Sequence, residues 1–143
     1  MRVNWGHRAA TVVLVAGCAT LFPPTPDELK HSAERFGRQV QWSDLRGAAL
    51  NFTPMARAIF VAETTKRDDE KNLKVTDVEL EDMVIAKDGK SAVVTTKLTW
   101  YRMPDLSTKT ERMVMHWEVR DNFWVLTQID GGPVAVNSPA KAP

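Results

Sequence analysis

The sequence predicts an α+β domain in which N-terminal helices pack on an antiparallel sheet of about four strands. Segments with capping signals and helical spacing of apolar residues come first. Near residues 66–73 the pattern becomes strand-like, and four such runs follow, joined by short turns. Helices followed by consecutive strands favour this class over an alternating parallel sheet.

The first helix is expected over residues 26–40. Thr25 can cap its N-terminus, Pro26 suits the first helical position, and Glu28 completes a capping box. An apolar stripe at helical spacing would face the core, and it consists of Leu29, Ala33, Phe36 and Val40.

Two further helices are expected before the sheet. Residues 42–44 predict the start of a short helix that runs to Leu50, although Gly47 weakens it. Thr53 and Pro54 repeat the capping signal, and this helix should end near Lys66. The charged run 66–71 then predicts a solvated connection to the first strand.

The four strands are expected over residues 73–86, 91–103, 109–120 and 123–130. Asp88 and Gly89 suit a tight hairpin turn, residues 103–106 predict the second turn, and Asp121 and Asn122 the third. Alternation places one set of side chains on a common face, where the helices would bury their stripes: Val94, Leu98, Trp100, Met113, Met115, Trp117 and Val119.

An export signal is expected at the N-terminus. Arg2 and Arg8 supply a basic region, residues 9–16 a short apolar region, and small residues precede Cys18. The apolar run is far shorter than the roughly 20 residues that a membrane-spanning helix needs. An ordinary cleaved signal, or a buried helix that contains a cysteine, is the alternative interpretation.

The run Val15-Ala16-Gly17-Cys18 resembles the lipobox of bacterial lipoproteins. The resemblance implies cleavage between Gly17 and Cys18 and transfer of a diacylglycerol to the Cys18 thiol. Because two acyl chains suffice for stable anchoring, such a group would fix the protein to a membrane without a polybasic patch. Ala19, where some lipoproteins have Asp, implies export to the periplasmic face of the outer membrane if the cell is Gram-negative.

These signals divide the chain into a signal peptide (1–17), a lipidated cysteine with a Pro-rich linker (18–25), one α+β domain (26–132) and a flexible tail (133–143). Loss of Arg2 and Arg8 with the signal leaves 17 of 19 basic side chains against 18 acidic ones. This balance argues against nucleic acid as a partner. Acylation of Cys18, the single cysteine, would exclude disulfides, thiolate metal sites and cysteine nucleophiles in the mature monomer.

The order of several segments resembles small bacterial lipoproteins with a domain similar to the cystatin-like roll of the nuclear transport factor 2-like superfamily. The matching segments are the helix after Thr25, residues 42–45, residues 52–57, and the long strands that end in residues 117–124. The resemblance implies helices packed into a strongly curved sheet. The superfamily includes enzymes and non-enzymatic binding domains, so the fold by itself selects no function.

Isomerases of this superfamily use an inward carboxylate and a tyrosine or protonated acid. Here Asp77, Glu79 and Glu81 share a predicted strand face, where we expect water to relieve their repulsion, and Tyr101 alternates away from Trp100. His31 and His116 have no second histidine or cysteine at metal-ligand spacing, so the sequence predicts no metal and no cofactor.

Aromatic and methionine residues remain as candidates for a binding surface. Four of them are open to interpretation as a pocket wall, a partner surface or plain core: Trp100, Met113, Met115 and Trp117. The expected function is a membrane-anchored, non-enzymatic interaction or accessory module of the cell envelope. The alternative is a small-molecule binding protein or enzyme that uses the concave pocket of the roll.

Overall fold

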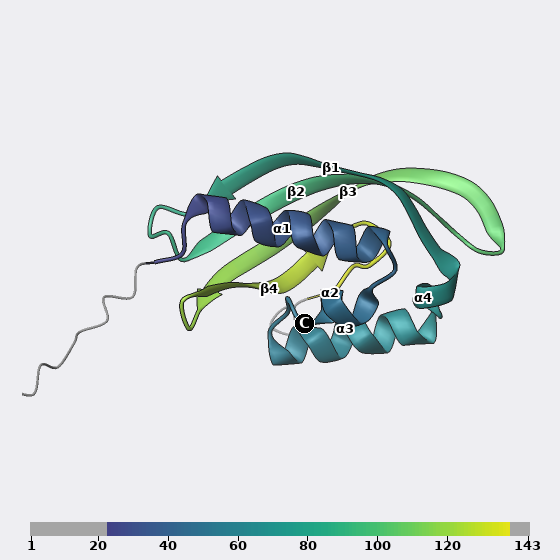
Figure 1. Ribbon diagram of the computed structural model, residues 1–143, viewed down its shortest axis with the longest axis horizontal. Coiled ribbons are helices and arrows are strands. Elements are labelled where there is room, and N and C mark those ends of the chain that lie inside the picture. The colour runs from purple at the N-terminus through teal and green to yellow at the C-terminus, as the bar shows by residue number, and fades with distance from the viewer. Residues whose placement is uncertain (1–22, 138–143) are drawn as a thin grey trace, which may run out of the picture.

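The computed structural model describes residues 23–137, which form four helices and one four-stranded sheet. The helices are α1 (Pro26–Gln41), α2 (Leu45–Ala49), α3 (Pro54–Lys66) and α4 (Asp69–Asn72). The strands are β1 (Leu73–Ile85), β2 (Ser91–Arg102), β3 (Asp105–Arg120) and β4 (Phe123–Asp130). The strands bend over the helices, which lie on one side of the sheet (Figure 1). The predicted α+β class is therefore confirmed.

Helix α1 begins with the predicted capping box. The Glu28 amide donates to the Thr25 hydroxyl over 3.2 Å, and the Thr25 amide donates to the Glu28 carboxylate over 2.7 Å. The predicted stripe of this helix is buried, and close approach to the sheet occurs at Gly37, where an added Cβ would lie 3.0 Å from Val78 of β1.

The second helix is shorter than predicted. Ser43 has a φ of 59°, which interrupts the helical path, and Asp44 then caps α2 by accepting from the Gly47 amide over 2.9 Å. Helix α3 begins at Pro54 and ends at Lys66 as expected. No helix among the described residues is long and apolar enough to cross a membrane.

The sheet is antiparallel with the order β1-β2-β3-β4. Strand β3 starts at Asp105, four residues before the predicted start, because Arg102 and Asp105 still pair across the second turn. Asp121 and Asn122 have φ values of 49° and 65°, which fit the tight third turn. The edge of β4 is extended by a parallel bridge between Phe52 and Leu126.

The core fills the space between the helices and the concave face of the sheet. Three phenylalanine rings from α1, α3 and the segment between α2 and α3 form its helical half, with Phe36 and Phe52 centroids 5.6 Å apart and Phe52 and Phe60 centroids 4.8 Å apart. The sheet contributes the fully buried side chains of Val94, Leu98, Met113, Met115, Trp117, Leu126 and Ile129. Apolar side chains therefore occupy the concavity.

The charged run 66–71 is exposed at four of its six residues, as expected, but Asp69 within it is buried. Asp69 is 1% exposed, and its carboxylate accepts from Arg67 Nε over 2.9 Å and from Arg102 Nε over 2.8 Å. Both guanidinium groups also donate to the carbonyl oxygen of Pro133, over 3.3 and 3.0 Å. We call Arg67, Asp69, Arg102 and the Pro133 carbonyl the Asp69 cluster. A buried charge needs such partners, and the cluster ties α4 to β2 and to the segment after β4.

The domain also extends past its predicted end at residue 132. Gly131 and Gly132 form a turn with φ values of 77° and 76°. The chain then returns to the sheet, where Val136 pairs with Ile129, and Val134 and Val136 are at most 1% exposed. Residues 133–136 thus belong to the domain. The predicted signal peptide, Gly17, Cys18 and the last six residues lie outside the described residues.

Candidate functional site

A groove crosses the outer face of the sheet, on the side opposite the core. The register joins Val84, Val93, His116 and Gln128 in one row across the four strands. Adjacent positions on these strands, such as Val94 and Met115, face the core, so this row faces outward. We call the hollow along it the outer-face groove.

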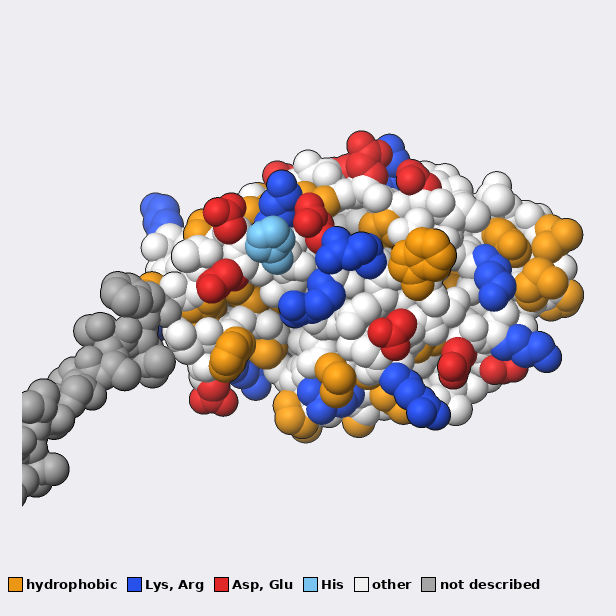
Figure 2. Space-filling model, in the orientation of Figure 1, with side chains coloured by type: hydrophobic (Ala, Val, Ile, Leu, Met, Phe, Trp, Pro, Cys, Tyr) orange, Lys and Arg blue, Asp and Glu red, His pale blue; other side chains and the backbone are white. Residues whose placement is uncertain are grey.

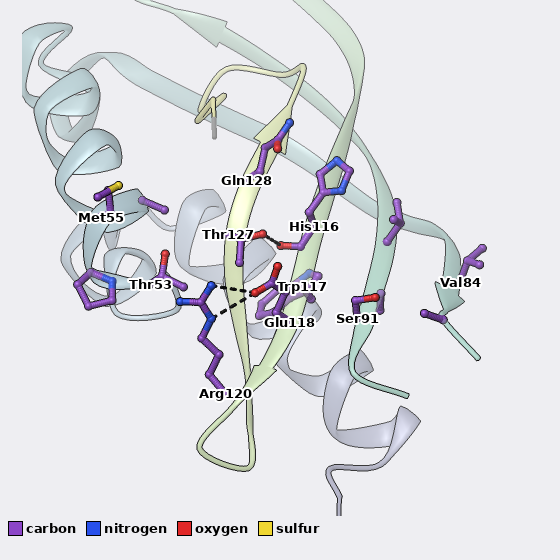
Figure 3. Close-up of a pocket in the computed structure, with 15 residues that line it drawn as sticks. Thr53, Met55, Val84, Ser91, His116, Trp117, Glu118, Arg120, Thr127 and Gln128 are labelled. Carbon is purple, nitrogen blue, oxygen red and sulfur yellow. Dashed lines mark hydrogen bonds and ion pairs between the residues drawn. The ribbon is translucent and has the colours of Figure 1, made fainter. Parts of the chain in front are cut away.

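The start of α3 forms one wall of the outer-face groove, because the bridge from Phe52 to Leu126 places this helix beside the edge of β4. The outer-face groove has a volume of about 750 Å³. The apolar lining consists of Pro54, Met55, Ala56, Val84, Ala86, Ala92, Val93 and Trp117. Figure 3 shows the lining residues spread from Met55 on α3, across His116 and Gln128, to Val84 on β1.

The polar side of the groove centres on His116. Its Nε2 lies 2.8 Å from Asp130 Oδ2, and Gln128 Nε2 donates to the other carboxylate oxygen of Asp130 over 2.6 Å. A shift in register between His116 and Trp117 permits this arrangement, because it brings Gln128 opposite His116 at the end of β4. His116 and Asp130 are both partly exposed, and of the two His116 lines the groove.

A second polar pair lies at the end of the groove near the third turn. Arg120 Nη2 donates to Glu118 over 2.9 Å, and both side chains are more than 40% exposed (Figure 3). Because this pair is solvated, its contribution to stability is small. The groove therefore offers one cation, one anion and a histidine beside apolar walls.

This arrangement can bind a ligand, and the imidazole of His116 is the group in it that could transfer a proton. The hydroxyl of Thr127 donates to the backbone oxygen of His116 over 3.2 Å and not to its ring (Figure 3). Residues 23–137 include no group of three or more His, Cys, Asp or Glu side chains placed to hold a metal ion.

For four residues the sequence left three alternatives open: a pocket wall, a partner surface or plain core. All four belong to the core. Trp100, Met113, Met115 and Trp117 are at most 5% exposed because the helices cover their face of the sheet. The interpretations as an open patch or pocket wall are therefore wrong for Trp100, Met113 and Met115. Trp117 lines the outer-face groove from its buried position.

The indole nitrogens of Trp100 and Trp117 have no hydrogen-bond partner among the described residues. Trp100 is instead covered by two cations, with Arg102 Cζ 5.1 Å and Lys109 Nζ 5.0 Å from its ring centroid. These contacts are of the cation–π type and stabilise the ring without a hydrogen bond. Trp100 thus serves packing at the far end of β2.

The three strand carboxylates that could have formed an acid/base set are exposed, as expected. Their repulsion is relieved by cations as well as by water, since Lys97 Nζ lies 2.8 Å from Glu79 and Arg112 Nε donates to Glu81 over 2.6 Å. The hydrogen bond from Arg112 lowers the pKa of Glu81 below its ordinary value. A lowered pKa is the opposite of what a proton-donating carboxyl group requires.

The outer-face groove was not predicted, although alternation along the third strand was expected to place Met115 and Trp117, the neighbours of His116, on the core-facing side. That alternation already places His116 opposite the core-facing residues of β3. The pairing of His116 with Asp130 depends on the register shift in β4, which has no signature in the sequence. The wall from α3 depends on a contact between distant segments.

A scan against family models and a search of curated protein sequences found no match to this chain. Its structure is similar to that of a SEC-C motif containing protein from Rhodopseudomonas palustris, with a TM-score of 0.57 and 9% identity over 71% of this chain and 77% of that one. It is also similar to an NTF-2-like protein of unknown function from Shewanella oneidensis MR-1. That match has a TM-score of 0.52 and 16% identity, and it covers 72% of this chain and 94% of the other.

At these identities the likeness concerns the fold alone. The helices followed by an open antiparallel sheet are those of an NTF2-like α+β fold, which the sequence resemblance had implied.

Proposed function

We propose that this protein is a membrane-anchored bacterial lipoprotein whose domain serves as a non-enzymatic interaction or accessory module of the cell envelope. The observation that carries the proposal is the run Val15-Ala16-Gly17-Cys18, which follows a basic and then a short apolar region. In this proposal the mature chain begins at an acylated Cys18. Ala19 supports a location on the periplasmic face of the outer membrane in a Gram-negative cell.

The non-enzymatic role is supported by the concave face of the sheet. A ligand pocket is a hollow with a few polar groups placed in it, whereas the inner face of the sheet is packed by Leu98, Met113 and Met115, each 0% exposed, with Thr96, 3% exposed, among them. Glu79 and Glu81 of β1 point outward and pair with cations. The second candidate function, binding of a small molecule, is favoured by one observation, the His116–Asp130 pair beside the apolar walls of the outer-face groove.

Acylation is tested by expressing the full chain in a lipoprotein-producing bacterium and measuring the intact mass of the mature protein. We expect a chain that starts at Cys18 and carries a diacylglycerol, and a membrane fraction that contains it. Cys18→Ser should abolish the lipid mass and release the domain from the membrane fraction or leave it unprocessed. An unmodified mature N-terminus at another position would contradict the proposal.

The interaction role is tested by crosslinking the anchored protein in its own envelope and identifying partners by mass spectrometry. A reproducible protein partner is expected. If none is found, and the purified soluble domain retains a small molecule that His116→Ala loses, the second candidate function replaces the first.

A further inference from the structure

Exposed apolar side chains surround the point at which the N-terminal chain joins the domain. Phe123 and Leu50 are each 70% exposed, and together with Pro24 they line one hollow of about 590 Å³. Figure 2 shows hydrophobic side chains on the surface at this end of the molecule. We call Pro24, Leu50 and Phe123 the N-terminal patch.

The N-terminal patch is held in a fixed arrangement. The buried Trp124 donates its indole N–H to the carbonyl oxygen of Thr25 over 3.3 Å, which joins the start of α1 to the start of β4. The two-residue turn at Asp121 and Asn122 sets the position of Phe123 immediately after it. The start of α1 and the turn between β3 and β4 lie at the same end of the domain (Figure 1).

Cys18 is close to this patch along the chain. It precedes Thr25 by seven residues, and a fully extended chain of that length spans at most about 25 Å. An acyl anchor on Cys18 would therefore keep the N-terminal patch nearer to the bilayer than the opposite end of the domain, where β2 turns into β3 (Figure 1). The tether also raises the effective concentration of the patch at the membrane surface.

From this placement we propose that the N-terminal patch docks on the lipid surface, with Phe123 and Leu50 in the boundary between headgroups and acyl chains. The inference rests on the proposed acylation of Cys18. Glu28, His31 and Arg35 line the same hollow, so the patch has charges of both signs around it. Docking would therefore depend on apolar contact more than on anionic lipid. Its consequence is a fixed orientation of the domain, with the turn between β2 and β3 directed away from the bilayer.

The test uses the fact that Cys18 is the single cysteine, because the acylated protein then has no free thiol. Phe123→Cys in the full-length lipoprotein can be labelled with the environment-sensitive fluorophore NBD and reconstituted in vesicles of phosphatidylethanolamine and phosphatidylglycerol. We expect a blue-shifted emission and at least twofold quenching by nitroxide-labelled phospholipid. Leu50→Cys should give the same response.

Leu106→Cys is the matched control. Leu106 is 67% exposed, close to the value for Phe123, but it lies at the turn between β2 and β3. The label at Leu106→Cys should keep the emission that it shows in water and should not be quenched. The mass of the acyl group and flotation with the vesicles are measured on the same samples.

These readouts separate the two proposals. A protein that carries the acyl mass and floats, but whose labels at positions 123 and 50 remain as exposed to water as the label at 106, would overturn docking and leave the lipoprotein proposal intact. A protein without the acyl mass that fails to float would overturn the lipoprotein proposal and the docking with it.

Discussion

At the residue scale, Gly131 is the glycine where an added side chain would meet rigid backbone at a positive φ. Its φ is 77°, and an added Cβ would lie 2.6 Å from the backbone oxygen of Arg112 on β3. Gly131→Ala should combine backbone strain with a clash that only a movement of β3 or of the turn can relieve. We expect the free energy of unfolding to fall by about 2–3 kcal/mol, measured by urea denaturation.

Gly89 provides the matched control for this prediction. It has a similar φ of 71°, but no heavy atom lies within 4 Å of the position of an added Cβ. Gly89→Ala should therefore lower the free energy of unfolding only by the cost of the positive φ, about 1 kcal/mol. Equal losses in the two variants would contradict the role of the close approach to Arg112.

Single residues were predictable where the alternation of a strand decides their environment. Val94, Leu98 and Trp100 face the core as expected, because β2 is regular along this stretch. The burial of Asp69 was not predictable, because its two arginine partners come from positions 67 and 102 and only the folded chain brings both to it. From the sequence alone, a run of charged residues is expected to be solvated, because ion-pair partners from distant segments are not visible in it.

At the scale of elements, the Asp69 cluster holds α4 against β2 and against the segment after β4. Asp69→Asn removes the charge that two guanidinium groups share at a site that is 1% exposed. Loss of one partner of a buried pair is strongly destabilising, and we expect a decrease of about 3 kcal/mol in the free energy of unfolding.

Glu63→Gln is the control, because Glu63 also pairs with Arg67, over 3.4 Å, but is 46% exposed. The expected loss is below about 0.5 kcal/mol. Thermal or urea unfolding of both variants gives the comparison. A loss in Asp69→Asn no larger than that in Glu63→Gln would show that the cluster does not stabilise the fold.

Helix starts and turns were predictable because they depend on local chemistry. The capping box at Thr25 and Pro54 at the start of α3 both mark the observed starts. Strand β3 starts four residues before the predicted Lys109, because cross-strand pairing with β2 continues to Asp105. Strand length depends on the partner strand as well as on the local sequence.

At the scale of the whole molecule, the last described residues complete the domain. A chain that ends at residue 132 loses the buried side chains of Val134 and Val136 and the Pro133 carbonyl that accepts from Arg67 and Arg102. Burial of two valines alone contributes about 3 kcal/mol. We expect this truncation to lower the melting temperature by about 10 °C or more, as measured by circular dichroism.

A chain that ends at Asn137 is the control for the truncation. It retains the pairing between Ile129 and Val136 and should melt within about 2 °C of the full chain. If the two truncations melt at the same temperature, residues 133–137 do not stabilise the domain.

The fold class was predictable because the change from helical to strand periodicity is strong and occurs once. The location of the outer-face groove was not predictable, because it depends on how α3 lies beside β4 and on the register shift at His116. Whether the concavity of the roll is open or filled is also set by the distance between the layers. Alternation therefore placed Trp100, Met113 and Met115 on the face that the helices cover, but it did not decide whether they line an open pocket or fill the core.

The two edges of the sheet differ in how they avoid pairing with another chain. On β4, backbone groups of Leu126 bond to Asn51 and Thr53, and those of Ile129 bond to Val136. On β1, two irregularities in register and the exposed charges of Glu79, Glu81 and Asp82 disfavour addition of a strand. Residues 133–136 thus shield part of an edge that would otherwise offer free amides and carbonyls for intermolecular β-pairing. Protection against aggregation is a second role of this short segment, separate from its contribution to the core.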